Sequence, residues 1–459
     1  MATVDGRDRT ALHAFVLVSA VTAGVVAQGG YYLPGRVLVI AVVAVAAALA
    51  LWGYPWTRGD AGPVSLAAGA LAVWILVRAI STGEYPEAVA AVATLGCLVA
   101  ALWVLRRTGS ATRLTVAHAL LGVGALVAGT AWLGVAARVP RFVILVENRL
   151  WRGASTLTYP NAAAALLVPL ALLALGLLAG RPRSAPYAAT GYLLLVGVGA
   201  AMSRAGFLAL LVGWVVLAVL VRTAIRHTVP LAVGASVAVA ALLPSFPATA
   251  APRPLPALLG LVGGAVLAIG PVFLPARLRT VTTATLLAGT VVAGALAVAA
   301  GPPRSGLLGT LWASRGNLES GGRSGALHTA LEMVAMRPLT GTGVGLARFV
   351  WDTPDGTGAV ALYAHDEYLQ TLVDLGLVGL VALLALLAAI ARYLYQGRRY
   401  PHPPGLWPGV VAALAALAVH SGFDFLWHIA VIPLAGGLLV GLAGPATEGT
   451  VNFEETEKV

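Results

Sequence analysis

The sequence predicts an all-α membrane protein: a polytopic bundle of about 14 transmembrane helices, with one large external loop that contains a short helix. Three observations predict this class. Of the 459 residues, 59% are hydrophobic and only 10% are charged, which is too little charge for the surface of a soluble chain of this length. Apolar runs of about 18 or more residues, each able to cross a hydrocarbon core of about 30 Å, recur along the chain. Arginines gather in the short segments between these runs.

The apolar runs and the loop breakers between them define the expected spans. These are about 11–28, 35–52, 63–80, 87–105, 114–135, 161–180, 187–202, 205–221, 229–246, 256–274, 280–300, 366–392, 408–422 and 429–444. Arg7 and Arg9 precede the first run as in a signal peptide, but no small-residue cleavage site follows, so we expect an uncleaved span. We expect three regions: 1–160 with the first helices and an external loop, 161–445 with the external loop 301–365, and a polar acidic tail, 446–459.

The net charge of +11 comes almost entirely from arginine, since Lys458 is the single lysine. With a cytoplasmic N-terminus, alternate short loops carry most of the basic residues, namely Arg58; Arg106, Arg107 and Arg113; Arg181 and Arg183; Arg222 and Arg226; Arg277 and Arg279; and Arg392, Arg398 and Arg399. This positive-inside pattern predicts that both termini are cytoplasmic, and it argues against nucleic acid as a partner. The loops 136–160 and 301–365, and Arg204, are then expected on the external face. The single cysteine, Cys97, excludes an internal disulfide and a cysteine-cluster metal site.

The long loop is expected to contain a helix that Ser324 caps and that ends before Pro338. One face of this helix is apolar and could lie on the membrane surface or against the bundle; it carries Leu327, Ala330, Leu331, Val334 and Ala335. Gly341, Gly343 and Gly345 follow. No strand precedes these glycines and no P-loop lysine follows them, so they favour a turn with close backbone approach over a phosphate cradle.

Two arginines are candidate ligands for an anion. Arg204 lies between two apolar runs with almost no loop. A charged guanidinium at membrane depth costs free energy unless it forms an ion pair or binds a ligand. Arg204 is either an ion-paired or snorkelling residue at a tight turn, or an anion ligand. Arg323, beside glycines at the start of the loop helix, is either solvated or a second ligand. Two such side chains can hold a diphosphate with charge-assisted, often bidentate bonds.

Polar residues also mark the start of the span at 366–392. They are either a polar cap on the helix, with Asp366 as N-cap beside Glu367, or part of a functional site in which His365 takes a proton near neutral pH. His420 and Asp424 would share a face if the chain were helical there, as a hydrogen-bonded pair that supports a helix break or as catalytic groups. The acidic residues of the outer loops are not spaced as a metal-ligand set, so neither a metal nor a cofactor is predicted; they are Asp352, Asp355, Asp366 and Glu367.

At these residues the chain resembles the O-antigen ligase / O-antigen polymerase superfamily of bacterial inner-membrane glycosyltransferases. The similar pieces are Ser203-Arg204-Ala205-Gly206; Gly322-Arg323 with Met336-Arg337-Pro338-Leu339-Thr340-Gly341-Thr342-Gly343; Ala364-His365-Asp366-Glu367-Tyr368-Leu369-Gln370 with Gly376-Leu377-Val378-Gly379; and His420-Ser421 with Asp424. They span roughly residues 190–440. Two positions depart from the family pattern: Asp366 replaces an asparagine, and Leu327 replaces a tryptophan.

The resemblance implies a metal-independent, inverting transfer of a glycan from an undecaprenyl-diphosphate carrier to an acceptor hydroxyl, on the outer face of the cytoplasmic membrane. It assigns the donor diphosphate to Arg204 and Arg323 and acceptor activation to His365, with Asp366, Glu367, His420 and Asp424 in support. It makes 161–445 the catalytic region, surrounded by membrane lipids. A glycan, lipid or protein could be the acceptor, and a polysaccharide polymerase or a lipid-linked sugar flippase are alternatives. Internal repeats with broken helices, common in transporters, are not evident in the sequence.

Overall fold

The computed structural model describes residues 6–53, 62–146, 149–300, 306–309, 321–352 and 357–445. Within these ranges nine helices are long and apolar enough to cross a membrane, and five shorter apolar helices accompany them. These helices correspond one to one with the expected spans, so the predicted all-α polytopic fold is confirmed. The acidic tail, Arg58 and Asp355 lie outside the described residues.

The chain divides into two compact units. Unit 1 consists of residues 1–117, 319–401 and 418–459, and unit 2 of residues 118–318 and 402–417. The helices of unit 1 are α1 (Gly6–Val26), α2 (Leu33–Gly53), α3 (Pro63–Thr82), α4 (Pro86–Arg106), α13 (Gly321–Met336), α14 (Glu367–Gly397) and α16 (Val431–Ala443), with the short 3-10 helices η1 (Gln28–Gly30) and η6 (Leu426–His428). A hairpin of β3 (Phe349–Asp352) and β4 (Gly358–Ala361) completes it.

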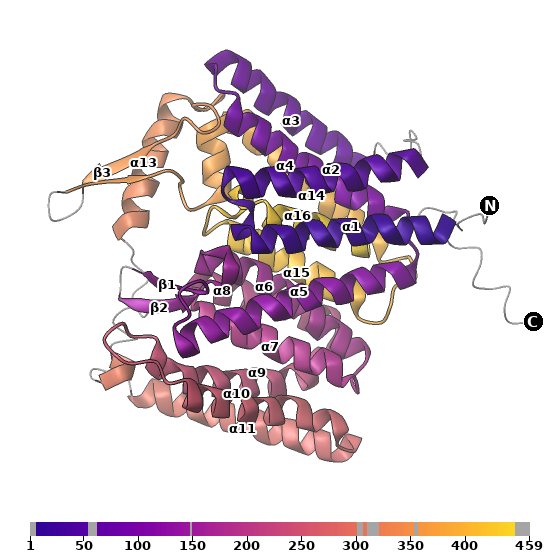
Figure 1. Ribbon diagram of the computed structural model, residues 1–459, viewed down its shortest axis with the longest axis vertical. Helices are drawn as coiled ribbons and strands as arrows, with labels where there is room; N and C mark the ends of the chain where they lie inside the picture. Colours follow the sequence, from indigo (N-terminus) through magenta and orange to yellow (C-terminus); the bar gives the residue numbers. More distant parts are fainter. Residues whose placement is uncertain are drawn as a thin grey trace, which may run out of the picture. The chain divides into compact units, whose positions relative to one another are not determined.

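Unit 2 contains α6 (Pro160–Gly180), α7 (Ala185–Ala201), α8 (Arg204–Leu220), α9 (Ala224–Leu242), α10 (Pro254–Ile269) and α11 (Ala276–Ala300), with the hairpin of β1 (Val143–Val146) and β2 (Leu150–Gly153). Two helices have residues in both units: α5 (Ser110–Ala137) and α15 (Leu406–Ser421). Figure 1 shows the helices of each unit packed side by side along much of their length.

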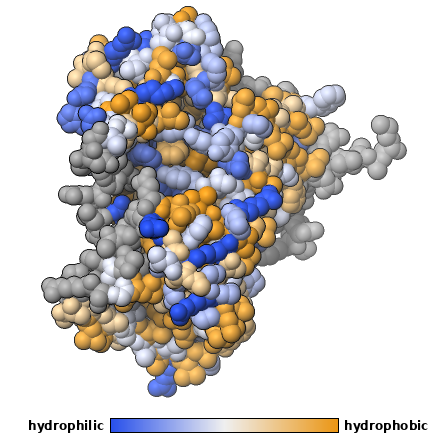
Figure 2. Space-filling view, turned by 60° about the vertical axis from the view of Figure 1, so that its left-hand side comes forward, coloured by the Kyte–Doolittle hydropathy of each residue, from blue (hydrophilic) through white to orange (hydrophobic). Residues whose placement is uncertain are grey.

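Local sequence signals set many of the helix starts. A proline occupies the first helical position of α3, α4, α6 and α10, where its missing N–H is not needed and its φ already suits a helix. Hydrophobic residues cover wide areas of the face seen in Figure 2. Large apolar side chains such as Val219, Val266 and Leu296 are exposed, as expected of helices whose solvent is lipid.

Helix α14 is broken at Gly376, whose φ of 67° and ψ of −169° lie outside the helical region. The segment that follows α13 bonds to the backbone groups at this break. The amides of Thr342 and Gly343 donate to the carbonyls of Val373 (2.8 Å) and Asp374 (2.9 Å), and the amide of Leu377 donates to the carbonyl of Pro338 (2.8 Å). From α3, Trp74 Nε1 donates to the carbonyl of Leu375 at 2.9 Å, and Arg78 Nη2 to that of Gly341 at 3.0 Å. A broken helix within a membrane protein needs such internal partners.

The glycine cluster therefore serves close backbone approach, as predicted. A Cβ atom at Gly341 would overlap the backbone of Asp374, and one at Gly376 would overlap the backbone of Leu339. Gly341, Gly343 and Gly345 all have positive φ, which glycine adopts without steric cost.

The two regions predicted to be external loops contain more structure than the sequence predicted. Both hairpins fall in segments expected to be loops. Helix α13 begins at Gly321, so Ser324 lies inside the helix and is not its cap; this expectation was wrong. The predicted apolar face is partly buried and partly exposed, so its position on the membrane surface or against the bundle stays a prediction. Ala326 and Ala330 pack against Phe349 of β3, whereas two residues of the predicted face, Leu327 and Leu331, are about half exposed at 48% and 54%.

Candidate functional site

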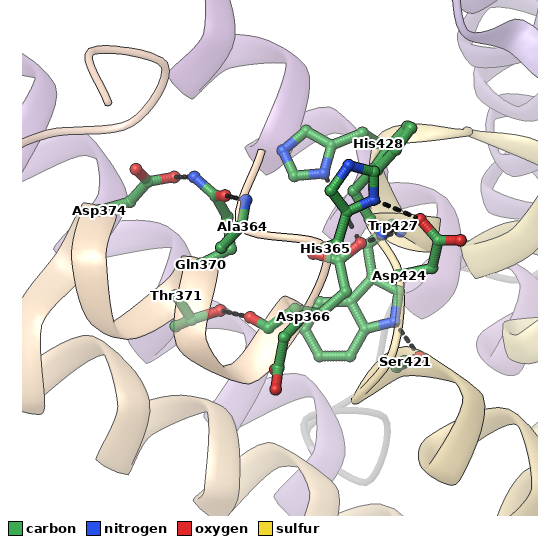
Figure 3. A network of polar contacts seen from close by, with 12 residues as sticks. Ala364, His365, Asp366, Gln370, Thr371, Asp374, Ser421, Asp424, Trp427 and His428 are labelled. Atoms are coloured by element: carbon green, nitrogen blue, oxygen red, sulfur yellow. Dashed lines mark hydrogen bonds and ion pairs between the residues drawn. The ribbon is translucent and has the colours of Figure 1, made fainter. Parts of the chain in front are cut away.

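Polar residues at the start of α14 meet those of the turn after α15, all within unit 1 (Figure 3). His365 immediately precedes the helix cap and has a φ of 55°, a conformation uncommon for residues other than glycine. Its Nδ1 lies 3.2 Å from Oδ1 of Asp424. The side chain of Asp424 is fully buried at 0% exposure, whereas that of His365 is 28% exposed. A hydrogen bond from Nδ1–H to the carboxylate would leave Nε2 as the proton acceptor.

The helix start holds the His365 segment in place. Asp366 is the N-cap of α14, and its Oδ1 accepts bonds from the amides of Tyr368 (2.9 Å) and Leu369 (3.0 Å). Gln370, one turn into the helix, accepts from the amide of Ala364 at 2.8 Å through Oε1. The backbone on both sides of His365 is thereby fixed, which accounts for its strained φ. Asp366 fulfils the capping role that the sequence predicted as one of its two possibilities.

A hydrogen-bonded chain joins this segment to the helix break. Gln370 Nε2 donates to Oδ2 of Asp374 at 3.0 Å, and the carbonyl of Asp374 accepts from Gly343 in the segment that closes the break. Gln370 and Asp374 are both buried. Hydrogen bonds therefore connect the backbone beside His365 to the break, although His365 and Gly376 are separated by three turns of helix.

The turn after α15 supplies Asp424. Helix α15 ends at Ser421, so Asp424 lies beyond it and the helical relationship considered between His420 and Asp424 does not exist. His420 is buried at the helix end. Ser421 Oγ accepts from Trp427 Nε1 at 3.0 Å, which ties this turn to η6. The carboxylate of Asp424 also accepts from the amide of Phe425 at 3.0 Å, so its orientation toward His365 is fixed by its own backbone.

Glu367 belongs to a second acid–base pair beside the first. It is 2% exposed, accepts a bond from the amide of Trp427, and its Oε1 lies 3.6 Å from Nδ1 of His428. Burial lowers the pKa of His428, but the Glu367 carboxylate and then Asp374 more than offset this effect, so the pKa lies above its ordinary value. The sequence pointed to Glu367 but not to its partner, 61 residues further along.

Aromatic rings and an N-terminal ion pair surround the two histidines. Tyr363 stacks on Phe425 with ring centroids 4.7 Å apart, and its ring lies 4.2 Å from that of His428. Tyr31, which follows η1, faces Phe425 at 6.4 Å. Its carbonyl accepts from Arg36 Nη2 at 3.1 Å, and Arg36 Nη1 is 3.3 Å from Glu87. The sequence did not point to these N-terminal residues. An apolar run predicts a transmembrane helix, but it does not show which distant loop the end of that helix contacts.

Arg204 lies in unit 2 and is the first residue of α8. Its predecessor, Ser203, caps the helix by accepting from the amide of Gly206 at 3.1 Å. The preceding turn is tight, as predicted: α7 ends at Ala201, and Met202 takes a left-handed φ of 45°. The turn is held by Arg152, a buried residue of β2, whose Nε donates to the carbonyl of Ala201 at 2.8 Å. Arg152 thus has a structural role at this turn.

Arg323 lies in α13, but its side chain is outside what the structure describes. His328, one turn later, is exposed, with Nδ1 3.2 Å from Glu332. Among the described residues, no three histidine, cysteine or acidic side chains gather closely enough to hold a metal ion. The site in unit 1 consists of a partly exposed histidine paired with a buried carboxylate and bordered by aromatic rings.

The fold and the site define a polytopic membrane protein with acid–base groups at one end of its helices. Residues 189–384 match the family model described as O-Antigen ligase. The match supports the O-antigen ligase superfamily, confirming the resemblance seen in the motifs. It covers Arg204, Arg323 and His365 and ends before Asp424. No curated protein matches the chain. The family match and the membrane helices support a membrane glycosyltransferase-like enzyme of a bacterial inner membrane, which uses a lipid-linked glycan and an acceptor.

Proposed function

We propose that the protein transfers a glycan from an undecaprenyl-diphosphate carrier to an acceptor hydroxyl, on the outer face of the cytoplasmic membrane, in cell-envelope polysaccharide assembly. Both termini are cytoplasmic in this proposal, as the distribution of arginines indicates. In Figure 1, α13 and the β3–β4 hairpin lie at the end of unit 1 away from the start of α1. This arrangement agrees with an outward-facing site at His365.

The pairing of His365 with buried Asp424 is the observation that carries the proposal. Nε2 of His365 removes the proton of the acceptor hydroxyl as its oxygen attacks the anomeric carbon. The bond from that carbon to the diphosphate oxygen breaks, the configuration inverts, and the lipid diphosphate leaves with both bonding electrons. Asp424 stabilises the resulting imidazolium and keeps the ring oriented. No metal is required, because a diphosphate is already a good leaving group.

Arg204 and Arg323 receive the donor diphosphate in this proposal. The assignment rests on the motifs that they share with the superfamily and on the suitability of guanidinium groups for phosphate oxygens. Cations held in a site shielded from bulk water stabilise negative charge as it develops on the leaving group.

The direct test is transfer by the purified protein in lipid, with a synthetic polyprenyl-diphosphate oligosaccharide as donor and EDTA present. We expect release of the lipid diphosphate together with growth of an acceptor glycan. A product extended by repeat units would identify a polymerase rather than a ligase. Donor binding with movement between leaflets and no bond cleavage would instead identify a flippase and refute the enzyme assignment.

Asp424→Asn is expected to lower the turnover rate about tenfold or more. The substitution keeps the shape of the side chain but replaces a charge-assisted hydrogen bond with a neutral one, which is roughly half as strong. Turnover and melting temperature are measured together, since a fall in turnover at an unchanged melting temperature isolates the effect on His365. Full turnover by the folded variant would show that the carboxylate charge has no part in the reaction.

Arg204→Lys is also expected to impair transfer, because lysine keeps the charge but lacks the planar fork that binds phosphate oxygens in a bidentate manner. Donor affinity is the appropriate measurement, made by displacement of a labelled polyprenyl diphosphate. Ser203 still caps α8 in this variant, so the helix start is unaffected. Donor affinity equal to that of the wild type would show that Arg204 contributes only its positive charge to donor binding.

A further inference from the structure

A second polar site lies in unit 1, at the end of α14 that is far from His365. It is an open hollow of about 180 Å³, lined by the first turn of α3, the end of α4 and the last turns of α14. Its polar lining consists of Ser65, Arg106, Arg392, Tyr393 and Gln396. Helix α14 begins at Glu367 and runs for 31 residues, so the hollow and the His365 site occupy the two ends of one helix.

The charged groups described in the wall of the hollow are basic. Arg106 and Arg392 both line it, and none of the described lining residues is acidic. The first turn of α3 adds the positive end of a helix dipole. Gly62, the N-cap residue of α3, has no side chain to cap the amides of that turn, and a helix start of this kind is an anion-binding element.

An independent observation points to a missing ligand. Tyr393 lines the hollow and is only 9% exposed, yet its buried hydroxyl has no hydrogen-bond partner in the part of the chain that the structure describes. A buried hydroxyl without a partner costs about 1–3 kcal/mol, so native structures seldom keep one without a reason. An oxygen-rich anion between Arg106, Arg392 and the start of α3 would accept this bond.

The residues around the hollow indicate what kind of molecule bears the anionic group. Leu102 and Ala389 supply an apolar part of its wall. Beyond it, the same helices α3 and α14 expose large apolar side chains, among them Leu66 (64%) and Val381 (58%). A molecule with an anionic head and a long apolar tail satisfies both surfaces at once, whereas a free anion satisfies only the first. Basic pockets between transmembrane helices are suited to anionic lipid headgroups.

We propose that this hollow is a binding site for the phosphate of an anionic membrane lipid, held by Arg106, Arg392, Tyr393 and the start of α3. The site is separate from the proposed glycan-transfer site. It lies at the arginine-rich end of these helices, where the positive-inside pattern places the inner leaflet. The bound lipid packs α3 and α4 against the last turns of α14, the helix whose first turn holds the His365 segment.

The test uses the full chain in an uncharged detergent, titrated with phosphatidylglycerol and with phosphatidylcholine. We expect saturable binding of phosphatidylglycerol and weaker binding of phosphatidylcholine, whose headgroup has no net charge. Arg392→Gln is expected to raise the apparent dissociation constant about tenfold, the effect of losing a charge-assisted bond. Tyr393→Phe removes only the hydroxyl and is expected to raise it about fivefold. The second variant retains the packing of α14, so it serves even if the first is unstable.

Arg398→Gln is the matched control. Arg398 lies in the same arginine-rich segment, but its Nη2 bonds to the hydroxyl of Tyr395 at 2.7 Å and it does not line the hollow; its affinity is expected to equal that of the wild type. Competition by inorganic phosphate would show that the site accepts the free anion, and its absence would assign the site to the lipid. A loss in Arg398→Gln equal to that in Arg392→Gln, or full affinity in Tyr393→Phe, would overturn the proposal.

Discussion

His365→Ala is expected to lower the rate of glycan transfer by about 10²–10⁴-fold, the usual contribution of a positioned general base. The rate of release of lipid diphosphate from the synthetic donor is the measurement, made with wild type and variant in the same lipid. The substitution removes the imidazole and its bond to Asp424, while Asp366 still caps α14 and Gln370 still holds Ala364. The helix start should therefore survive, and the variant should insert and fold.

His328→Ala provides the matched control for this experiment. His328 belongs to the same unit, but its side chain is 79% exposed and pairs with Glu332 on the surface of α13, a contact that contributes little. Its removal is expected to leave the rate unchanged. Normal transfer by His365→Ala would rule out the proposed base, and equal losses in both variants would mean that histidine substitutions act through folding or insertion.

The sequence was a good guide to the helices, because a transmembrane span is specified locally. A run such as 161–180 contains its own length signal, and Pro160 supplies a start signal. The hairpins gave no comparable signal: β3 and β4 have four residues each, too few for a periodic pattern of apolar residues to stand out in the sequence. Ser324 was misread for the same reason, since a capping residue is recognised only by its distance from a helix start that the sequence leaves open.

Some residues of the candidate site could be predicted from the sequence, but the pairs that they form could not. His365, Glu367 and Asp424 stand out because polar groups beside apolar runs are costly. Which of them meet is decided by the fold: Asp424 turns to His365 because α15 ends three residues earlier, and Glu367 turns to His428. Neither pair has a spacing that a sequence pattern could show. Tyr31 and Arg36 lie further still from any motif, in a segment that precedes the matched residues 189–384.

Gly376→Ala is expected to destabilise the protein by about 3–5 kcal/mol, which is large for a single added methyl group. The backbone at this residue has a φ of 67° and a ψ of −169°, and such a conformation costs a residue with a side chain about 1–3 kcal/mol. The added Cβ would also overlap the backbone of Leu339. To relieve that overlap, the chain must give up bonds such as Leu377 to Pro338, each with a net value of about 1 kcal/mol. The melting temperature of the purified protein is the measurement.

Gly69→Ala distinguishes this effect from a general intolerance of glycine substitution. Gly69 lies within α3, which packs against α14, and a Cβ atom there would meet nothing within 4 Å. Alanine favours a helix interior over glycine by up to about 1 kcal/mol, so this variant should be as stable as the wild type or slightly more so.

Gly376→Ala should also slow transfer in the molecules that remain folded, because hydrogen bonds from Asp374 through Gln370 to Ala364 link the break to the His365 segment. Unchanged stability in Gly376→Ala would mean that the break is not held by the segment 338–343, and full activity would mean that the break does not position His365.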